Sequence, residues 1–222
     1  SLHTDPSLRG IDRGLLHLEA RFSHEKRMQK IAGIFWHTLE LLERDRELLE
    51  RAFVEGCPPV SIARLENARQ FHDFLIGYWH RKPPRLPYIA DVAACEFALA
   101  QARDRGRLAP GTGHRIADDG EPPVRPAVRR NPDVILLRCR YDIRAIFTSD
   151  GVQRTPPARD VGLSVTARHD GRGPDVAEVD LTVYDLLSAL EAWTPLRLFP
   201  KRSAAQRLFA DLITRGLLET RG

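Results

Sequence analysis

The histidines and cysteines are the residues of this chain with the most chemical potential, because imidazole and thiolate groups bind metals and act as bases or nucleophiles. His17 and His24 lie seven residues apart, and His72 and His80 lie eight apart, so either pair could share one helix face. Neither pair has a third ligand at metal-binding spacing, and no His-Glu-x-x-His motif occurs. We therefore expect no metal and no cofactor in this chain.

The three cysteines, Cys57, Cys95 and Cys139, are far apart and form no Cys-x-x-Cys pair. Their odd number and wide spacing argue against a disulfide framework or a zinc site and are typical of a reducing cytosol. The segment Gly111-Thr112-Gly113 lacks the preceding strand and following helix of a phosphate-binding loop. These patterns favour a protein that is not an enzyme. The alternative is a catalyst with which a metal or cofactor co-purifies.

The charge of the chain bears on its partners. Its 222 residues carry a net charge of +4 with a pI near 9.2, which can indicate nucleic-acid binding. Residues 131–222 contain 13 Lys/Arg against 12 Asp/Glu, however, so that part has no concentrated basic stripe. No segment approaches the roughly 18 apolar residues of a membrane span, and no secretory signal is visible. We expect a cytoplasmic protein with no membrane partner, and nucleic acid is disfavoured.

Helical periodicity dominates residues 1–106, which we assign to a helical, partner-docking domain. Apolar residues recur at helical spacing over 25–53, where the helix could bend near Asp45, and again over 61–79 and 88–105. Proline-marked turns separate these segments, which predicts a compact bundle. Residues 107–131 are rich in Gly and Pro and are interpreted as a linker or loop.

Residues 132–222 change to alternating patterns, with strands expected over 134–141, 160–168 and 176–183 and a hairpin turn between the last two. Two helices are expected to follow, because Thr182 and Ser203 begin capping-box-like patterns. Gly216 stands where a helix C-cap is needed. The predicted fold class is α+β, with an N-terminal helical bundle followed by a winged-helix-like module of three strands and then three helices.

Such a module offers two binding surfaces. The outer edge of strand 176–183 could accept an extended peptide as a further strand, with the final helix completing a groove. The final helix could instead enter a DNA groove, although Asp211 would face the phosphates unfavourably. An edge that is capped and binds nothing is the third possibility. The residues that we expect to contact a peptide are Val176, Ala177, Glu178, Val179, Asp180, Leu181, Thr182, Arg207, Leu208, Asp211 and Arg215.

The segment Leu86-Pro87-Tyr88-Ile89-Ala90-Asp91-Val92-Ala93-Ala94-Cys95-Glu96-Phe97-Ala98 resembles the "LPYLADVARLEWA" segment of a bacterial family labelled as a DNA-binding domain. Segments 52–59 and 71–75 resemble that family's "AFV…PP…FPDFL" pattern. Members of this family commonly accompany multinuclear non-haem iron enzymes of the methanobactin-synthase type. The resemblance covers about residues 30–105. It implies that this chain is the partner, in a heterodimer, of an enzyme that carries the iron.

The C-terminal part is similar to the recognition element of ribosomally synthesised, post-translationally modified peptides (the RiPP recognition element), as seen in segments 181–187 and 208–218. In that family, the leader of a ribosomal precursor peptide adds to the third strand and packs on the third helix. These elements would be 176–182 and 204–215 here. Together the resemblances imply a non-catalytic subunit that presents a cysteine of the peptide to an iron-dependent oxidase. Partner proteins of 3-thiaglutamate biosynthesis are the closest type.

Overall fold

The computed structural model of the chain describes residues 12–107, 126–148, 155–168, 173–199 and 203–221. It divides into two compact units, Ser1–Leu86 and Pro87–Gly222. Within the described ranges, no helix combines the length and the apolar character needed to cross a membrane.

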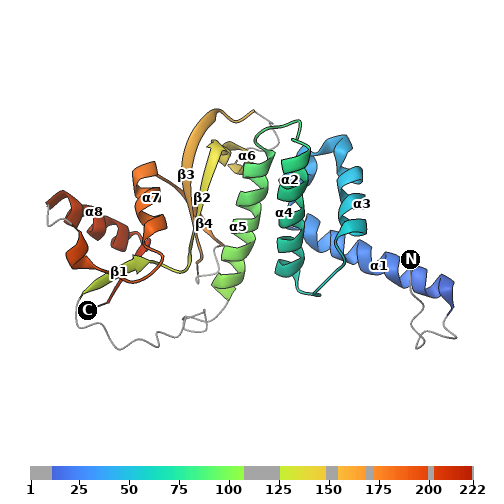
Figure 1. Cartoon of the computed structure of the whole chain (residues 1–222), viewed down its shortest axis with the longest axis horizontal. Coiled ribbons are helices and arrows are strands. Elements are labelled where there is room, and N and C mark those ends of the chain that lie inside the picture. Colours follow the sequence, from blue (N-terminus) through green and yellow to red (C-terminus); the bar gives the residue numbers. More distant parts are fainter. Residues whose placement is uncertain (1–11, 108–125, 149–154, 169–172, 200–202, 222) are drawn as a thin grey trace. The chain divides into compact units, whose positions relative to one another are not determined.

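The N-terminal unit is helical (Figure 1). Its elements are α1 (Arg13–Ala32), α2 (Trp36–Leu41), the 3-10 turn η2 (Glu43–Asp45), α3 (Arg46–Gly56) and α4 (Arg64–Arg81). Phe35, Phe53 and Phe71 are fully buried in its core. The ring of Phe71 packs edge-on against those of Phe35 and Phe53, with centroids 5.2 and 5.0 Å away. This cluster joins the start of α2, the end of α3 and the middle of α4.

The helical pattern over 25–53 is not one continuous helix, because the chain turns after α1 and again around η2. Glu43 adopts a positive φ of 46° at the second turn. A straight helix would separate Phe35 from Phe53 by roughly 27 Å, so the turns are what allow both rings to reach Phe71. In α3, Leu49 is 2% exposed and its neighbour Leu48 is 50% exposed, so the helix buries the face that carries Leu49.

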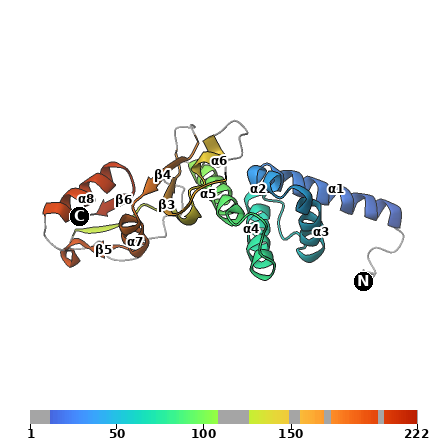
Figure 2. The same cartoon turned by 90° about the horizontal axis from the view of Figure 1, so that it is seen from above.

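The C-terminal unit contains helices and two antiparallel three-stranded sheets (Figures 1 and 2), which confirms the mixed α and β class. The first sheet has the order β2-β3-β4 and the second the order β5-β1-β6. The elements are α5 (Ile89–Arg107), β1 (Ala127–Arg130), β2 (Val134–Tyr141), α6 (Arg144–Thr148), β3 (Ala158–Thr166), β4 (Asp175–Val179), α7 (Leu181–Ala189), β5 (Thr194–Pro195), the 3-10 turn η3 (Leu196–Leu198), α8 (Ser203–Thr214) and β6 (Leu218–Arg221).

Both faces of the sheet β2-β3-β4 are covered. On one face, Val165 and Val176 pack with Ala98 and Ala102 of α5. On the other, Val134 and Val179 join a cluster with Leu187, Leu190, Leu212 and Leu218. Figure 1 shows these strands between α5 and α7. Because both faces are buried, β3 has five consecutive buried residues, Val161–Val165, instead of a simple alternation.

The helix α5 belongs with the C-terminal unit, whereas the sequence placed it in a domain spanning 1–106. Its Ala98 and Ala102 are small enough to let the helix approach the sheet closely. The Asp91 carboxylate also accepts hydrogen bonds from the N–H groups of Arg140 (2.8 Å) and Tyr141 (3.1 Å). These contacts join α5 to the sheet, so the unit boundary lies before it rather than in the Gly/Pro-rich segment 107–131.

Two short strands also differ from the expectation, whereas the predicted C-cap does not. The strand β1 lies inside the predicted linker, whose residues 108–125 are outside the described ranges. The chain ends in the strand β6, which pairs with β1 and places Ala127 opposite Arg221. Each strand needs a partner about 90 residues away, so its local pattern is weak. The predicted C-cap is confirmed: Gly216 has a φ of 70°, and the N–H of Leu217 donates to the Leu212 carbonyl.

Glycine 106 sits where α5 approaches the end of β3. A Cβ at Gly106 would lie 2.4 Å from the backbone carbonyl oxygen of Arg168, whereas one at Gly77 in α4 would meet only Arg81, 4.0 Å away. Glycine-to-alanine changes inside helices normally stabilise by about 0.5–1 kcal/mol. We expect Gly77→Ala to follow this rule and Gly106→Ala to lower the unfolding free energy by about 1–3 kcal/mol. Urea denaturation measures both, and stabilisation by Gly106→Ala would contradict the close approach.

Candidate functional site

The strand β4 lies at one end of its sheet, and no described strand pairs with its outer side. The register pairs Gly162, Ser164 and Thr166 of β3 with Val179, Ala177 and Asp175 of β4. The N–H of Ala167 donates to the carbonyl of Asp133 in the chain leading into β2, at 3.1 Å. Odd-numbered residues of β3 therefore bond β2, and even-numbered ones bond β4.

The backbone N–H and C=O groups of Asp175, Ala177 and Val179 therefore point toward β3. The N–H and C=O groups of Val176 and Glu178 point to the open edge, where no described residue hydrogen-bonds to them. The other edge of the sheet is different, because the Asp91 carboxylate covers the end of β2. Burial raises the pKa of Asp91.

The expected binding strand 176–182 ends earlier than the alternation indicated. Leu181 and Thr182 belong to the first turn of α7. Asp180 is the N-cap, and its Oδ1 accepts a hydrogen bond from the N–H of Thr182 at 2.8 Å. The capping residue is therefore Asp180 and not Thr182. A side chain that caps the following helix stops the strand, although the alternation of apolar residues continues through Val183.

A compact charge cluster anchors β4 to its neighbours. Arg159 of β3 donates to both Asp142 (2.6 Å) and Glu178 (2.7 Å). Arg144 of α6 pairs with the same two carboxylates, at 2.7 Å from each. The hydrogen bond from Arg144, followed by that from Arg159, holds the pKa of Asp142 well below its usual range. Because each cation is shared by two anions, the cluster fixes β4 relative to β3 and α6.

This cluster predicts acid sensitivity of the C-terminal unit. The folded-state pKa of Asp142 is depressed, so its stabilising contribution is complete above the ordinary aspartate pKa of about 4 and is lost as the pH falls below it. We expect Asp142→Asn to cost about 1–2 kcal/mol at pH 7 and to make the fall in stability between pH 5 and pH 3, measured by urea denaturation, shallower. An identical pH profile for the variant and the parent chain would contradict this role.

The residues in and just after α8 that we expected to contact a peptide fall into two sets. Leu208 is half-buried against the hydrophobic cluster that contains Val179, so the strand and the helix share a core. Arg207, Asp211 and Arg215 are exposed at four-residue intervals, and Arg215 lies 3.6 Å from Asp211 in an ion pair. Contacts of α8 concentrate on β6, whereas α7 packs on β3 and β1. The helix that flanks the sheet carrying β4 is therefore α7, which the predicted groove did not include.

The second sheet carries an arrangement that the sequence did not indicate. The guanidinium groups of Arg129 and Arg221 each lie 4.4 Å from the centre of the Trp193 ring. Glu219 accepts from Arg129 at 2.9 Å. Such cation–π contacts join β1, β6 and the residue just before β5. The four residues of β1, two apolar residues followed by two arginines, do not alternate, so no strand signal was available there.

Two of the three cysteines lie in the core of the protein. Cys95 and Cys139 are buried, and burial raises the pKa of each thiol to about 12, so both remain protonated at neutral pH. Among the described residues, no group of three or more His, Cys, Asp or Glu side chains is arranged to hold a metal ion.

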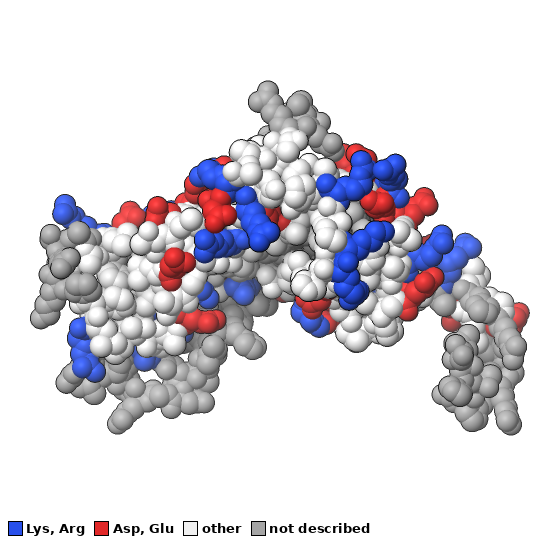
Figure 3. All heavy atoms as spheres, turned by 45° about the horizontal axis from the view of Figure 1, so that its top comes forward, with Lys and Arg blue, Asp and Glu red and all other residues white. Residues whose placement is uncertain are grey.

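On the face drawn in Figure 3, Lys and Arg are interspersed with Asp and Glu and form no continuous basic stripe.

No protein-family model matches the chain, and no curated protein matches it. The open edge of β4, with its two outward-facing peptide groups and its anchoring charge cluster, is consequently the candidate site defined by geometry alone.

Proposed function

We propose that this chain is a non-catalytic binding subunit that captures an extended peptide by strand addition to β4. The observation that carries the proposal is the unpaired edge, at which the peptide groups of Val176 and Glu178 face outward in a sheet covered on both faces. Backbone hydrogen bonds would supply affinity, and side chains lining the edge would supply selectivity. The winged-helix-like arrangement of strands and helices expected from the sequence belongs to this proposal.

The occupant that we propose is the leader of a ribosomally made precursor peptide, and the second partner is an iron-dependent oxidase docked on the N-terminal unit. The resemblance of segment 86–98 to a family that accompanies such enzymes, and of segment 181–187 to the RiPP recognition element, supports this choice. Tethering the leader would raise the local concentration of the precursor's cysteine at the iron site of the partner. The oxidative chemistry would belong to the other chain.

Co-expression tests this proposal. The chain is produced with the iron enzyme and the short cysteine-containing peptide encoded beside it, and the complex is isolated by a tag on the chain. We expect the enzyme and the peptide to be retained together and the cysteine to be modified only when the chain is present. Absence of both partners from the complex would refute the proposal. Saturable, steeply salt-dependent binding of duplex DNA would instead favour a regulator.

A further inference from the structure

The N-terminal unit has a shallow, open depression of about 410 Å³ between α1 and α4. It is lined by Lys26, Gln29 and Lys30 of α1 and by Arg64, the first residue of α4. Three of the four lining side chains are therefore cationic. None of the described carboxylates forms an ion pair with any of these three cations. The depression therefore concentrates positive charge that the described carboxylates leave unneutralised.

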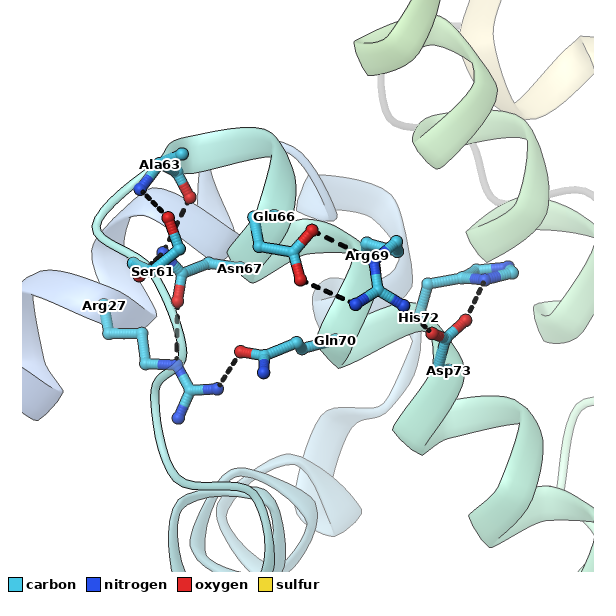
Figure 4. A network of polar contacts seen from close by, with 9 residues as sticks. All are labelled: Arg27, Ser61, Ala63, Glu66, Asn67, Arg69, Gln70, His72 and Asp73. Atoms are coloured by element: carbon cyan, nitrogen blue, oxygen red, sulfur yellow. Dashed lines mark hydrogen bonds and ion pairs between the residues drawn. The ribbon is translucent and has the colours of Figure 1, made fainter.

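Two of the cations are held in place. The Nζ of Lys30 donates to the Ile62 carbonyl at 2.8 Å, and Nη2 of Arg64 donates to the Gly33 carbonyl at 2.7 Å. No side chain caps α4, and the acidic residue of its first turn, Glu66, pairs with Arg69 and not with the cations of the depression. Arg27 of α1 donates to Asn67 and Gln70 of α4, and these hydrogen bonds fix α1 against α4 (Figure 4).

The chain beside the depression is apolar and exposed. Ile62, whose carbonyl receives the Lys30 hydrogen bond, is 90% exposed, and Val60 is 68% exposed. Isolated apolar side chains on a surface are ordinary, but two of them beside preordered cations suit a ligand with both carboxylates and apolar side chains. A phosphate ion would not use Ile62 or Val60, and a nucleic acid would need a longer basic track.

We propose that this depression, defined by Lys26, Lys30 and Arg64 with Ile62 and Val60 at its margin, is a docking site for an acidic segment of a partner protein. Carboxylates of the segment bind the three cations, and its apolar side chains cover Ile62 and Val60. The inference rests on the proposed function only for the identity of the partner, the iron enzyme. The charge complementarity itself does not depend on that identity.

In the first test, calorimetry measures the binding of a synthetic peptide of alternating Glu and Leu residues to the whole 222-residue chain at low ionic strength. We expect saturable binding that Lys26→Glu/Lys30→Glu weakens at least tenfold and that Ile62→Ser weakens several-fold. Arg81→Glu/Lys82→Glu, at the other end of α4, is the charge-matched control and should change the affinity less than twofold. Equal weakening by Arg81→Glu/Lys82→Glu would overturn the site, because it would indicate nonspecific attraction.

A second variant displaces one of the cations without changing the net charge of the chain. A Cβ at Gly33 would lie 2.8 Å from Nη2 of Arg64, so Gly33→Ala should displace this guanidinium and weaken peptide binding several-fold while circular dichroism stays unchanged. Inorganic phosphate and duplex DNA are titrated in parallel. Saturable binding of either one that is as strong as peptide binding and is lost in Lys26→Glu/Lys30→Glu would overturn the protein-segment assignment.

Retention of the iron enzyme by the tagged chain distinguishes the docking-site proposal from the proposed function. If the parent chain retains the enzyme and Lys26→Glu/Lys30→Glu retains it equally, the depression is not the docking site, although the proposed function stands. If the parent chain retains no enzyme, the proposed function fails, and the peptide titration alone decides the inference. Loss of enzyme retention in Lys26→Glu/Lys30→Glu, with retention by Arg81→Glu/Lys82→Glu unaffected, supports both proposals.

Discussion

Replacing Arg27 with methionine is expected to destabilise the N-terminal unit by about 3–5 kcal/mol, because it would leave one buried and two part-buried acceptors without their donor. Arg27 is only 4% exposed, and its guanidinium donates to Asn67 (3.0 Å), to Gln70 (2.8 Å) and to the Cys57 carbonyl. It also lies 4.3 Å from the centre of the Phe53 ring. Burial lowers the pKa of Arg27, but an arginine remains charged at neutral pH.

Arg69 provides the matched control. It also makes three hydrogen bonds, two to Glu66 and one to Asp73, but its side chain is 52% exposed (Figure 4). Water can replace those contacts, so Arg69→Met should cost less than about 1 kcal/mol. Urea denaturation with hydrogen exchange of the α1 and α4 amides would measure both changes. If the two variants lost similar stability, Arg27 would not be the connection that holds α1, α4 and residue 57 together.

Replacing Val176 with proline is expected to weaken peptide binding at least tenfold, provided that the peptide adds to β4. The N–H of Val176 points to the open edge, so proline there removes a donor without breaking the pairing with β3. The lost hydrogen bond accounts for about 1–1.5 kcal/mol, or roughly tenfold in affinity, and the ring adds steric exclusion. Fluorescence anisotropy of labelled peptides that tile the precursor would measure the change.

Val176→Ala is the control for this prediction, because Val176 also packs against the cluster beneath α5. It removes apolar contacts but keeps the N–H, so its affinity should stay within about threefold of the parent. Ala177→Pro should instead disturb pairing with β3 and reduce stability. Unchanged affinity in Val176→Pro, with a normal circular dichroism spectrum, would mean that the peptide binds elsewhere.

The helices and the strands with long, regular patterns could be predicted from the sequence. The strand predicted over 134–141 corresponds to β2 with the same limits, and the helices predicted over 61–79 and 88–105 correspond closely to α4 and α5. In these segments local propensity and burial periodicity agree with the final packing. The strand predicted over 176–183 was too long, because the capping hydrogen bond of Asp180 outweighs continued alternation.

The candidate site was predictable only in outline. An edge strand before a helix follows from the order of patterns, but the outward direction of Val176 and Glu178 depends on the register against β3. The cluster of Asp142, Arg144, Arg159 and Glu178 joins residues up to 36 positions apart, which no spacing rule connects. For Arg27, one signal existed. It shares a helix face with the buried Ile31, four residues later.

The sequence by itself determined the mixed α and β composition, most helix locations, the three longest strands and the Gly216 cap, because these depend on interactions between near neighbours in the chain. The tertiary structure alone decided that α5 joins the C-terminal unit, that β1 and β6 pair in a second sheet, and which residues of β4 face the open edge. The same holds for the gathering of Lys26, Lys30 and Arg64 around one depression. Each of these features depends on contacts between distant residues, whose geometry no local pattern encodes.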